Sequence, residues 1–441
     1  MCGLLIKNCD VLSFTGHKPA FLLHHNIWVE GNRIKAISPS RPNPDDVNYE
    51  LIDGTGMLAV PGMINTHAHV PMVLFRGAAE DVTLTEWFND YIFPMESNLT
   101  PEDVYWGALL GIAEMIEAGI TYVADHYFYM DEVAKAINKA GIRANLAWAV
   151  FEHEGLDQLK KTTEFVSRWQ GKADGRIKTW LGPHSPYLCG PEFLNKCAQV
   201  AGDLDVGVHL HVAETREQVE GSLKQFKKTP IQLLLETGIL ERPAILAHCL
   251  YPIIDDLEII ADHPAGIGQA PKTYLRAGMG MGDIDKYLNH NIPLGLATDG
   301  AASSSTLDLF EQMRLMALTQ KLIQEDASAA PLDTIVRIAF NGGAEVVQEP
   351  ELGALIPGNL ADIVLLRQDR AAGIPRLNLS ANLVYSLGAT DVDTVICDGR
   401  LLMHNHRHLM IDKEEVKREV EQRLERLIQR VPGRKVAVYP T

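Results

Sequence analysis

The chain of 441 residues has little positive charge to offer an anionic partner. Its 40 Lys and Arg residues stand against 57 Asp and Glu residues, which gives a net charge of −17. Nucleic acids and anionic membranes are bound through patches of Lys and Arg. The densest basic run, residues 224–228, has the pattern of a solvated helix end. The composition therefore argues against nucleic acid and against a membrane as partners.

Long apolar runs and an ordered set of cysteines are missing as well. No run of the sequence approaches the length of a membrane-spanning helix. The first ten residues lack the basic start and the long apolar core of a secretion signal. The six cysteines follow no repeating spacing, which is typical of reduced thiols, at Cys2, Cys9, Cys189, Cys197, Cys249 and Cys397. We therefore expect a cytoplasmic protein.

From about residue 60 the sequence alternates between short apolar runs and helical patterns. Thr100 is the expected N-cap of one helix, with Pro101 in its first turn and Gly119 after its end. Eight strand-like runs end near His67, Asp125, Val150, Gly182, His211, His248, Gly268 and Asp299. Eight strand–helix units predict an α/β fold of the (β/α)8 TIM-barrel type. The doubly wound alternative lacks its glycine fingerprint after the first strand.

Both ends of the chain carry strand patterns outside this alternation. Residues 26–30 and 34–37 flank the dipeptide Gly-Asn, which is the pattern of a β-hairpin. Strand patterns return after the barrel, and we predict that the two ends pair into one small β-sandwich domain. The expected divisions are residues 1–58 for its first part, 59–357 for the barrel, and 358–441 for its second part with a terminal helix.

Polar residues at the ends of the predicted barrel strands form a candidate metal site. His67 and His69 end the first strand, and because alternate side chains share a face, both imidazoles point to one side. His209 and His211 also share a face of the fifth strand, and the sequence alone does not separate them. We favour His211, which is nearer the end of the strand. Asp299 on the eighth strand completes a mixed nitrogen and oxygen set, which is typical of an open catalytic metal site.

The chain resembles the amidohydrolase superfamily in a series of short motifs. These are Pro-Gly-x-Ile-Asn-x-His-x-His at 61–69, Gly-Pro-His-Ser-Pro-Tyr at 182–187, His-x-x-Glu at 211–214, Ala-His-Cys at 247–249 and Thr-Asp-Gly at 298–300. The resemblance covers nearly the whole chain. It is strongest to the branch of nucleoside and triazine deaminases, and within that branch to the methylthioadenosine/S-adenosylhomocysteine deaminases.

The resemblance implies a metal-dependent deaminase of an adenosine-type nucleoside: methylthioadenosine, S-adenosylhomocysteine or adenosine. The alternative is an aminohydrolase or chlorohydrolase that acts on another N-heterocycle of triazine, guanine or pterin type. One divalent ion, Zn²⁺ with Fe²⁺ as the alternative, would be held by His67, His69, His211 and Asp299. Residues 182–184 read Gly-Pro-His where relatives with two metals carry a carboxylated lysine, so the expected site is mononuclear.

The resemblance also implies three catalytic roles. Glu214 would shuttle a proton to the ring nitrogen of the substrate, and Asp299 would accept the proton of the attacking water. His248 would orient that water and stabilise the developing oxyanion. Asp125 and His126 either support the metal ligands from behind or are ordinary loop residues.

Substrate contacts are expected from Trp87, Glu96, Trp148, His184 and Ser303. The resemblance places Glu96 on the ribose hydroxyls, although Glu96 and Ser303 could instead serve at the start of a neighbouring helix. Trp148 stands near the end of the third strand, where relatives that act on S-adenosylhomocysteine are expected to carry an arginine, so the 5′ substituent stays open. We expect a small-molecule substrate and a homo-oligomer, either a dimer or a tetramer.

Overall fold

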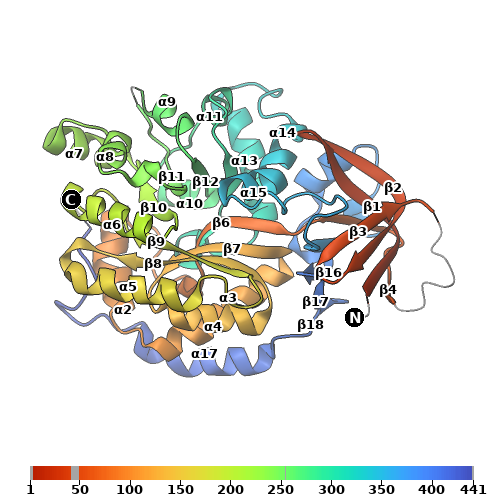
Figure 1. The fold of residues 1–441 in the computed structure, drawn as a ribbon, viewed down its shortest axis with the longest axis horizontal. Helices are drawn as coiled ribbons and strands as arrows, with labels where there is room; N and C mark the ends of the chain where they lie inside the picture. Colours follow the sequence, from red (N-terminus) through yellow and green to blue (C-terminus); the bar gives the residue numbers. More distant parts are fainter. Residues whose placement is uncertain (1–2, 41–48, 254, 440–441) are drawn as a thin grey trace.

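The computed structural model describes residues 3–40, 49–253 and 255–439. Within them the strands form two sheets of nine strands each. Figure 1 shows the two parts of the molecule, with the sheet of the chain ends on one side and the helix-covered sheet filling the rest.

The larger part is a parallel sheet that closes on itself. Its eighth strand is split in two: β13 pairs with β12, and β14 pairs with β6 through Asp299 and Ala68. This split strand closes the predicted TIM barrel of eight units and confirms it. The strands are β6 (Met63–His69), β7 (Ile120–Tyr127), β8 (Arg143–Val150), β9 (Ile177–Pro183), β10 (Val208–Val212), β11 (Ala244–His248), β12 (Ala265–Gln269), β13 (Leu294–Leu296) and β14 (Asp299–Gly300).

Helices that follow the barrel strands begin at the signals seen in the sequence. The Thr100 side chain accepts a hydrogen bond from the Asp103 N–H, and the Asp103 carboxylate accepts one from the Thr100 N–H, which closes a capping box on α3. The barrel helices are α3 (Pro101–Glu117), α4 (Met130–Ala140), α5 (Gly155–Trp169), α6 (Pro191–Asp203), α7 (Arg216–Phe226), α8 (Pro230–Glu236), α9 (Asp256–Ala261), α10 (Pro271–Ala277), α11 (Ile284–Asn289), α12 (Ala301–Ser304) and α13 (Leu309–Ile323).

Between β6 and α3 the chain forms four short helices, whose residues line the cavity at the carboxyl ends of the barrel strands. They are η1 (Val70–Phe75), α1 (Leu84–Glu86), η2 (Trp87–Ile92) and α2 (Phe93–Glu96). The remaining short helices are η3 (Glu152–Glu154), η4 (Ile239–Glu241), η5 (Ile338–Gly342), η6 (Ala371–Gly373), η7 (Asn382–Ser386) and η8 (Ala389–Asp391), with α14 (Leu332–Arg337), α15 (Gly343–Val346) and α16 (Leu379–Ala381).

The second sheet joins the two ends of the chain, as the sequence predicted. Strand β5 pairs antiparallel with β15, and the expected hairpin joins β2 to β3 with Glu30 opposite Arg33. Buried residues from both ends, such as Leu4 and Ile363, form an apolar core of its own. The strands are β1 (Gly3–Thr15), β2 (Lys18–Glu30), β3 (Arg33–Ser38), β4 (Tyr49–Asp53), β5 (Met57–Pro61), β15 (Ile363–Arg367), β16 (Val392–Cys397), β17 (Arg400–His404) and β18 (Arg407–His408).

A buried charge cluster ties this sheet to the barrel. Arg143 begins β8, and its Nε lies 3.1 Å from Asp362 Oδ2 while its Nη2 lies 2.6 Å from Asp398 Oδ1. All three side chains are buried. Because Arg143 starts its strand, the second sheet attaches at the amino ends of the barrel strands.

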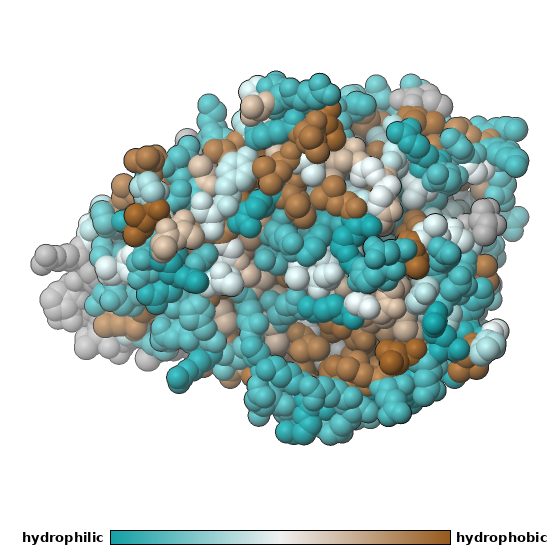
Figure 2. All heavy atoms as spheres, turned by 180° about the vertical axis from the view of Figure 1, so that it is seen from behind, coloured by the Kyte–Doolittle hydropathy of each residue, from teal (hydrophilic) through white to brown (hydrophobic). Residues whose placement is uncertain are grey.

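The terminal amphipathic helix is α17 (Lys413–Leu427), which packs on α3. None of the helices in the described ranges combines the length and the apolar character that crossing a membrane requires. Hydrophilic side chains cover most of the face shown in Figure 2, and apolar side chains form separate patches on it.

Candidate active site

Most of the predicted site residues meet in one cavity at the carboxyl ends of the barrel strands. The cavity has a volume of about 940 Å³ when counted to its open mouth. His69, His211, Glu214, His248 and Asp299 all line it. The strand ends and the helices between β6 and α3 therefore build the site together.

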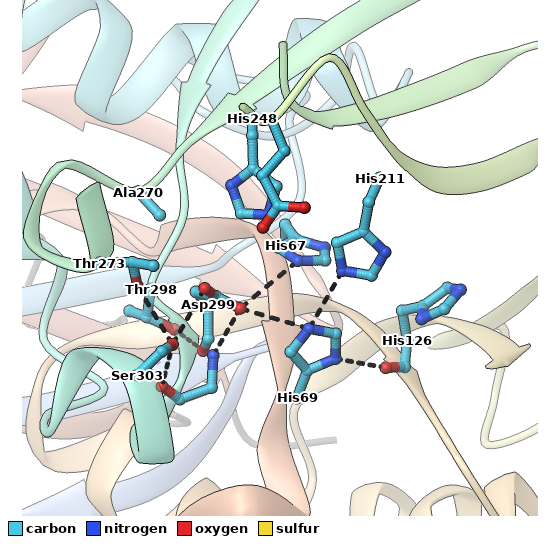
Figure 3. Close-up of polar contacts among 12 residues, drawn as sticks. His67, His69, His126, His211, His248, Ala270, Thr273, Thr298, Asp299 and Ser303 are labelled. Atoms are coloured by element: carbon cyan, nitrogen blue, oxygen red, sulfur yellow. Dashed lines mark hydrogen bonds and ion pairs between the residues drawn. The ribbon is translucent and has the colours of Figure 1, made fainter. Parts of the chain in front are cut away.

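Four side chains that can ligate a metal point toward one another from three barrel strands (Figure 3). They are His67 and His69 on β6, His211 on β10 and Asp299 on β14. The Nε2 atom of His69 lies 3.3 Å from Nε2 of His211 and 3.3 Å from Oδ1 of Asp299. The Nε2 atom of His67 lies 3.6 Å from the same Asp299 oxygen. Ligand atoms of His67, His69 and His211 lie within 4.8 Å of one another, which is the spacing of a group that surrounds one ion.

Each of the three histidines is anchored through its other ring nitrogen. The Nδ1 atoms of His69 and His211 lie 2.5 Å and 2.9 Å from the carbonyl oxygens of His126 and His184. His67 Nδ1 lies 2.8 Å from Nε2 of His209. These contacts orient the rings and leave the three Nε2 atoms facing the centre.

This arrangement separates the two histidines that the sequence could not tell apart. His211 brings its Nε2 to the centre, whereas the only side-chain hydrogen bond of His209 within the described residues goes to the back of the His67 ring. Asp125 accepts a hydrogen bond of 2.7 Å from the Val70 N–H, directly after His69. Asp125 and the His126 carbonyl therefore hold the His69 segment in place.

The protonation of the cluster fits a bound cation. Burial lowers the pKa of His67 to about 3 and holds that of His211 well below its usual range, so both imidazoles are neutral. Burial acts to lower the pKa of His69, but the hydrogen bond and charge of Asp299, the His126 carbonyl and the charge of Asp125 together raise it to about 9. Burial acts to raise the pKa of Asp299, but the nearby His67 and His69 rings hold it far below its usual range.

These side chains fit a divalent metal ion. Within the described residues His67 Nε2 is buried without a hydrogen-bond partner, and such an atom costs free energy unless something binds it. A cation at the centre would bind this lone pair and would take the place of the proton that His69 and Asp299 share. Two neutral imidazoles, a third histidine and a carboxylate match the ligands that a catalytic zinc ion prefers.

Glu214 lies beside the cluster with one carboxylate oxygen held and the other free. Its Oε2 accepts hydrogen bonds of 3.1 Å each from the Tyr187 hydroxyl and the Gln218 side-chain amide. Its Oε1 lies 3.8 Å from Nε2 of His248. A carboxylate fixed through one oxygen can move a proton through the other.

His248 is held from behind by a tyrosine. Its Nδ1 lies 3.3 Å from the Tyr274 hydroxyl, and that hydroxyl accepts a hydrogen bond of 2.8 Å from the Ala270 N–H. The Nε2 atom of His248 consequently faces Glu214 and the cavity.

Four of the five predicted substrate residues line the cavity: Trp87, Glu96, His184 and Ser303. The fifth prediction was wrong, because Trp148 is absent from the lining and packs on Phe165 of α5. Side chains alternate along a strand, and on β8 Ala149 is the residue that faces the cavity.

Ser303 and Glu96 have contacts that the alternative helix-start roles do not explain. The Ser303 hydroxyl donates a hydrogen bond of 3.0 Å to Asp299 Oδ2, while residues Gly300 and Asp308 occupy the N-cap positions nearby. Glu96 is the last residue of α2, is buried, and accepts a hydrogen bond of 2.7 Å from the Tyr127 hydroxyl. Burial raises the pKa of Glu96 to about 7.

The sequence did not reveal the aromatic wall of the cavity or the partners of Glu214. Phe88, Phe93, Phe128 and Phe151 line the cavity together with Trp87. Gln218 had a usable signal, because it stands four residues after Glu214, at the start of a helix. The phenylalanines had none, since their side chains come together only when three different loops fold.

Comparisons with known proteins agree on one family. The amidohydrolase family profile matches residues 58–402. Among curated relatives, the 5-methylthioadenosine/S-adenosylhomocysteine deaminase of Desulforudis audaxviator is 40% identical and covers 97% of this chain and 100% of its own.

Solved structures share the fold over nearly the full length. The adenosine deaminase from Xanthomonas campestris, with bound zinc, matches with a TM-score of 0.90 at 26% identity and covers 97% of this chain and 98% of its own. The atrazine chlorohydrolase from Arthrobacter aurescens, complexed with zinc, matches with a TM-score of 0.88 at 26% identity and covers 96% of this chain and 100% of its own.

Proposed function

The chain belongs to the amidohydrolase family, and we propose that it deaminates an adenosine-type nucleoside by hydrolysis. It is a hydrolase of carbon–nitrogen bonds other than peptide bonds. The proposed substrates are methylthioadenosine, S-adenosylhomocysteine and adenosine, each of which would release ammonia and become the inosine analogue. The main support for this proposal is that His67, His69, His211 and Asp299 come together beside Glu214 at one cavity.

The protein uses a divalent metal, and we propose that it is a single Zn²⁺ ion held by His67, His69, His211 and Asp299. The zinc in the two similar structures supports this choice over Fe²⁺. When bound, the ion supplies an activated water nucleophile near neutral pH. The fourth strand ends in residues 182–184 without a lysine, which supports one ion and not two.

Three side chains supply the proton transfers in this proposal. Asp299 takes the proton of the attacking water, because its carboxylate reaches into the centre while Ser303 holds its second oxygen. Glu214 carries a proton to the ring nitrogen through its free Oε1. His248 directs its Nε2 at the oxygen that attacks and stabilises the charge that develops there.

Glu96 supports a nucleoside over a bare heterocycle. A buried carboxylate that already accepts one hydrogen bond from Tyr127 can accept two more from vicinal hydroxyls of a ribose. The aromatic wall offers apolar contact for the rest of the substrate.

An aminohydrolase or chlorohydrolase of another N-heterocycle is the second candidate, because the atrazine chlorohydrolase structure matches the fold over the same share of the chain. Glu96→Gln separates the two. Its kcat/KM should fall about 10- to 100-fold for nucleosides, because a buried charged acceptor is lost, and should stay unchanged for guanine and triazines. The measurement is ammonia release over a panel of adenosine, methylthioadenosine, S-adenosylhomocysteine, guanine and aminotriazines. Turnover of only the ribose-free compounds would overturn the nucleoside proposal.

We further propose a homo-oligomer, a dimer or a tetramer, in the cytoplasm. Exposed apolar side chains on α13 support association, since Leu318 is 49% and Leu322 is 74% exposed. Light scattering should give the mass of a dimer or tetramer, and Leu322→Glu should lower it; a monomeric mass for the unchanged protein would contradict the proposal.

A further inference from the structure

The last described residues of the chain pack behind the wall of the active site. After α17 the chain, drawn in blue in Figure 1, runs along the outside of the barrel to the side of the molecule away from the second sheet. We name residues 428–439 the C-terminal tail. Tyr439 at its end is only 6% exposed.

The C-terminal tail is bound to the helices that carry substrate residues. The Val436 N–H donates a hydrogen bond of 3.2 Å to the Phe93 carbonyl oxygen on α2. The backbone of Tyr439 donates to and accepts from the Asn89 side chain on η2, at 3.0 Å and 3.1 Å. Because α2 also carries Glu96, the tail and the substrate-binding segment form one packed unit.

The ring of Tyr439 stands directly behind the aromatic wall of the cavity. It stacks on Phe88 with ring centroids 4.7 Å apart and ring planes 5° apart. It also meets the ring of Tyr187, at a centroid distance of 5.6 Å and with the ring planes 64° apart. Phe88 lines the cavity and Tyr187 donates to Glu214, so Tyr439 contacts both the wall and a partner of the proposed proton carrier.

Gln218 connects the tyrosine hydroxyl to Glu214. Its Oε1 accepts a hydrogen bond of 3.0 Å from the Glu214 backbone N–H. Its Nε2 donates one hydrogen bond of 3.1 Å to the Glu214 carboxylate and another of 3.0 Å to the Tyr439 hydroxyl oxygen. A side-chain amide has two N–H donors, and both are used here. The three contacts leave the amide one orientation.

We propose that Tyr439 is a positioning residue for catalysis, and that it fixes Gln218 so that Gln218 holds the Glu214 carboxylate. The proposal rests on the proposed function, in which Glu214 moves the proton. Without the tyrosine oxygen, one buried N–H of Gln218 has no acceptor, and the amide gains freedom to turn away from Glu214. The proton transfer then slows, while the contacts that bind the substrate stay in place.

The test uses Tyr439→Phe, which keeps the stacked ring and removes the acceptor. Its control is Val438→Ala, because Val438 is in the same segment and 59% exposed. We expect Tyr439→Phe to lower kcat about tenfold with KM within about twofold, a loss of the size expected for one unpaired buried donor. Val438→Ala should match the unchanged protein.

A second measurement on the same variants, backbone hydrogen exchange, needs no substrate. Hydrogen exchange at the Glu214 backbone N–H reports whether Gln218 still holds it, because Gln218 Oε1 is its acceptor. We expect faster exchange in Tyr439→Phe and unchanged exchange in Val438→Ala. Unchanged exchange in Tyr439→Phe would overturn the proposal whatever the activity.

A double-mutant cycle with Gln218→Leu tests the relay itself. If Tyr439 acts through Gln218, Tyr439→Phe should change kcat no further once Gln218 is gone. Additive effects, or faster exchange without any loss of kcat, would overturn the positioning role. If the unchanged protein released no ammonia from any nucleoside, the proposed function would fail by itself, and the exchange data would still decide whether Tyr439 fixes Gln218.

Discussion

Single residues of the site are fixed through the atoms that face away from its centre. His67, His69 and His211 each use Nδ1 as an anchor, and Glu214 uses Oε2. The opposite atom of each side chain is thereby left to bind a cation or to move a proton. A substitution that changes the atom facing the centre, but keeps the shape of the side chain and its anchoring contact, should therefore affect the chemistry and leave the fold intact.

Glu214→Gln should lower kcat by about 10²- to 10⁴-fold, because an amide of the same shape cannot take up and deliver a proton. The metal content should not change, since Glu214 is outside the proposed ligand set. Steady-state ammonia release and metal analysis measure both effects. The exposed Glu220→Gln on α7, the helix that begins two residues after Glu214, is the control. A Glu214→Gln enzyme with the unchanged rate would remove Glu214 from the mechanism.

Glu96 should make nucleoside binding depend on pH. Burial raises its pKa to about 7, so the carboxyl group becomes protonated as the pH falls below 7 and loses acceptor capacity for ribose hydroxyls. KM for a nucleoside should therefore rise as the pH is lowered from 8 to 6. In Glu96→Gln, KM should be higher and flat over this range, and a sloping KM in that variant would assign the titration to another group.

The elements of the barrel explain which residues the sequence could identify. His67 and His69 were predictable because the alternation of side chains along β6 puts both on one face. The same alternation along β8 places Trp148 outside the cavity once its neighbour Ala149 is known to line it. His209 and His211 share a face and differ only in depth, which a local pattern does not encode. Tyr439 had no signal, because its contact with Gln218 joins residues 221 positions apart.

His211 reaches the centre of the site and His209 lies behind His67, so we expect different effects when each of these two β10 residues is replaced by alanine. His211→Ala should abolish stoichiometric metal binding, because it removes a proposed ligand. His209→Ala should weaken metal affinity about 10- to 100-fold, because it frees the ring of His67 without removing a ligand. Metal titration monitored by calorimetry measures both affinities, and the prediction is wrong if the two variants behave alike.

The whole molecule divides its tasks between the two ends of the barrel. The chemistry lies at the carboxyl ends of the strands, and the second sheet attaches at the amino ends through Arg143. The sequence predicted both parts, because strand patterns at the two chain ends are local features. It also predicted that the two ends pair, but not that β5 pairs with β15, since the choice between distant strands depends on the folded barrel that brings them together.

Arg143→Ala should destabilise the fold by about 3–5 kcal/mol, because it leaves the buried Asp362 carboxylate without its cation and Asp398 with only Arg176 at 4.0 Å. Urea unfolding measures the change in the free energy of unfolding. Arg400→Ala is the matched control: its ion pair with Asp174 is 2.8 Å long but exposed, and its loss should cost less than about 1 kcal/mol. Equal losses in both variants would contradict the buried cluster's role.

The central claim, a deaminase that works with one divalent ion, is tested most directly by titrating metal-free protein with Zn²⁺ while ammonia release from methylthioadenosine is measured. We expect no ammonia without metal, a linear rise in rate as Zn²⁺ is added, and a plateau at one equivalent. No ammonia at any ratio, or a plateau that needs two tightly bound ions, would contradict it.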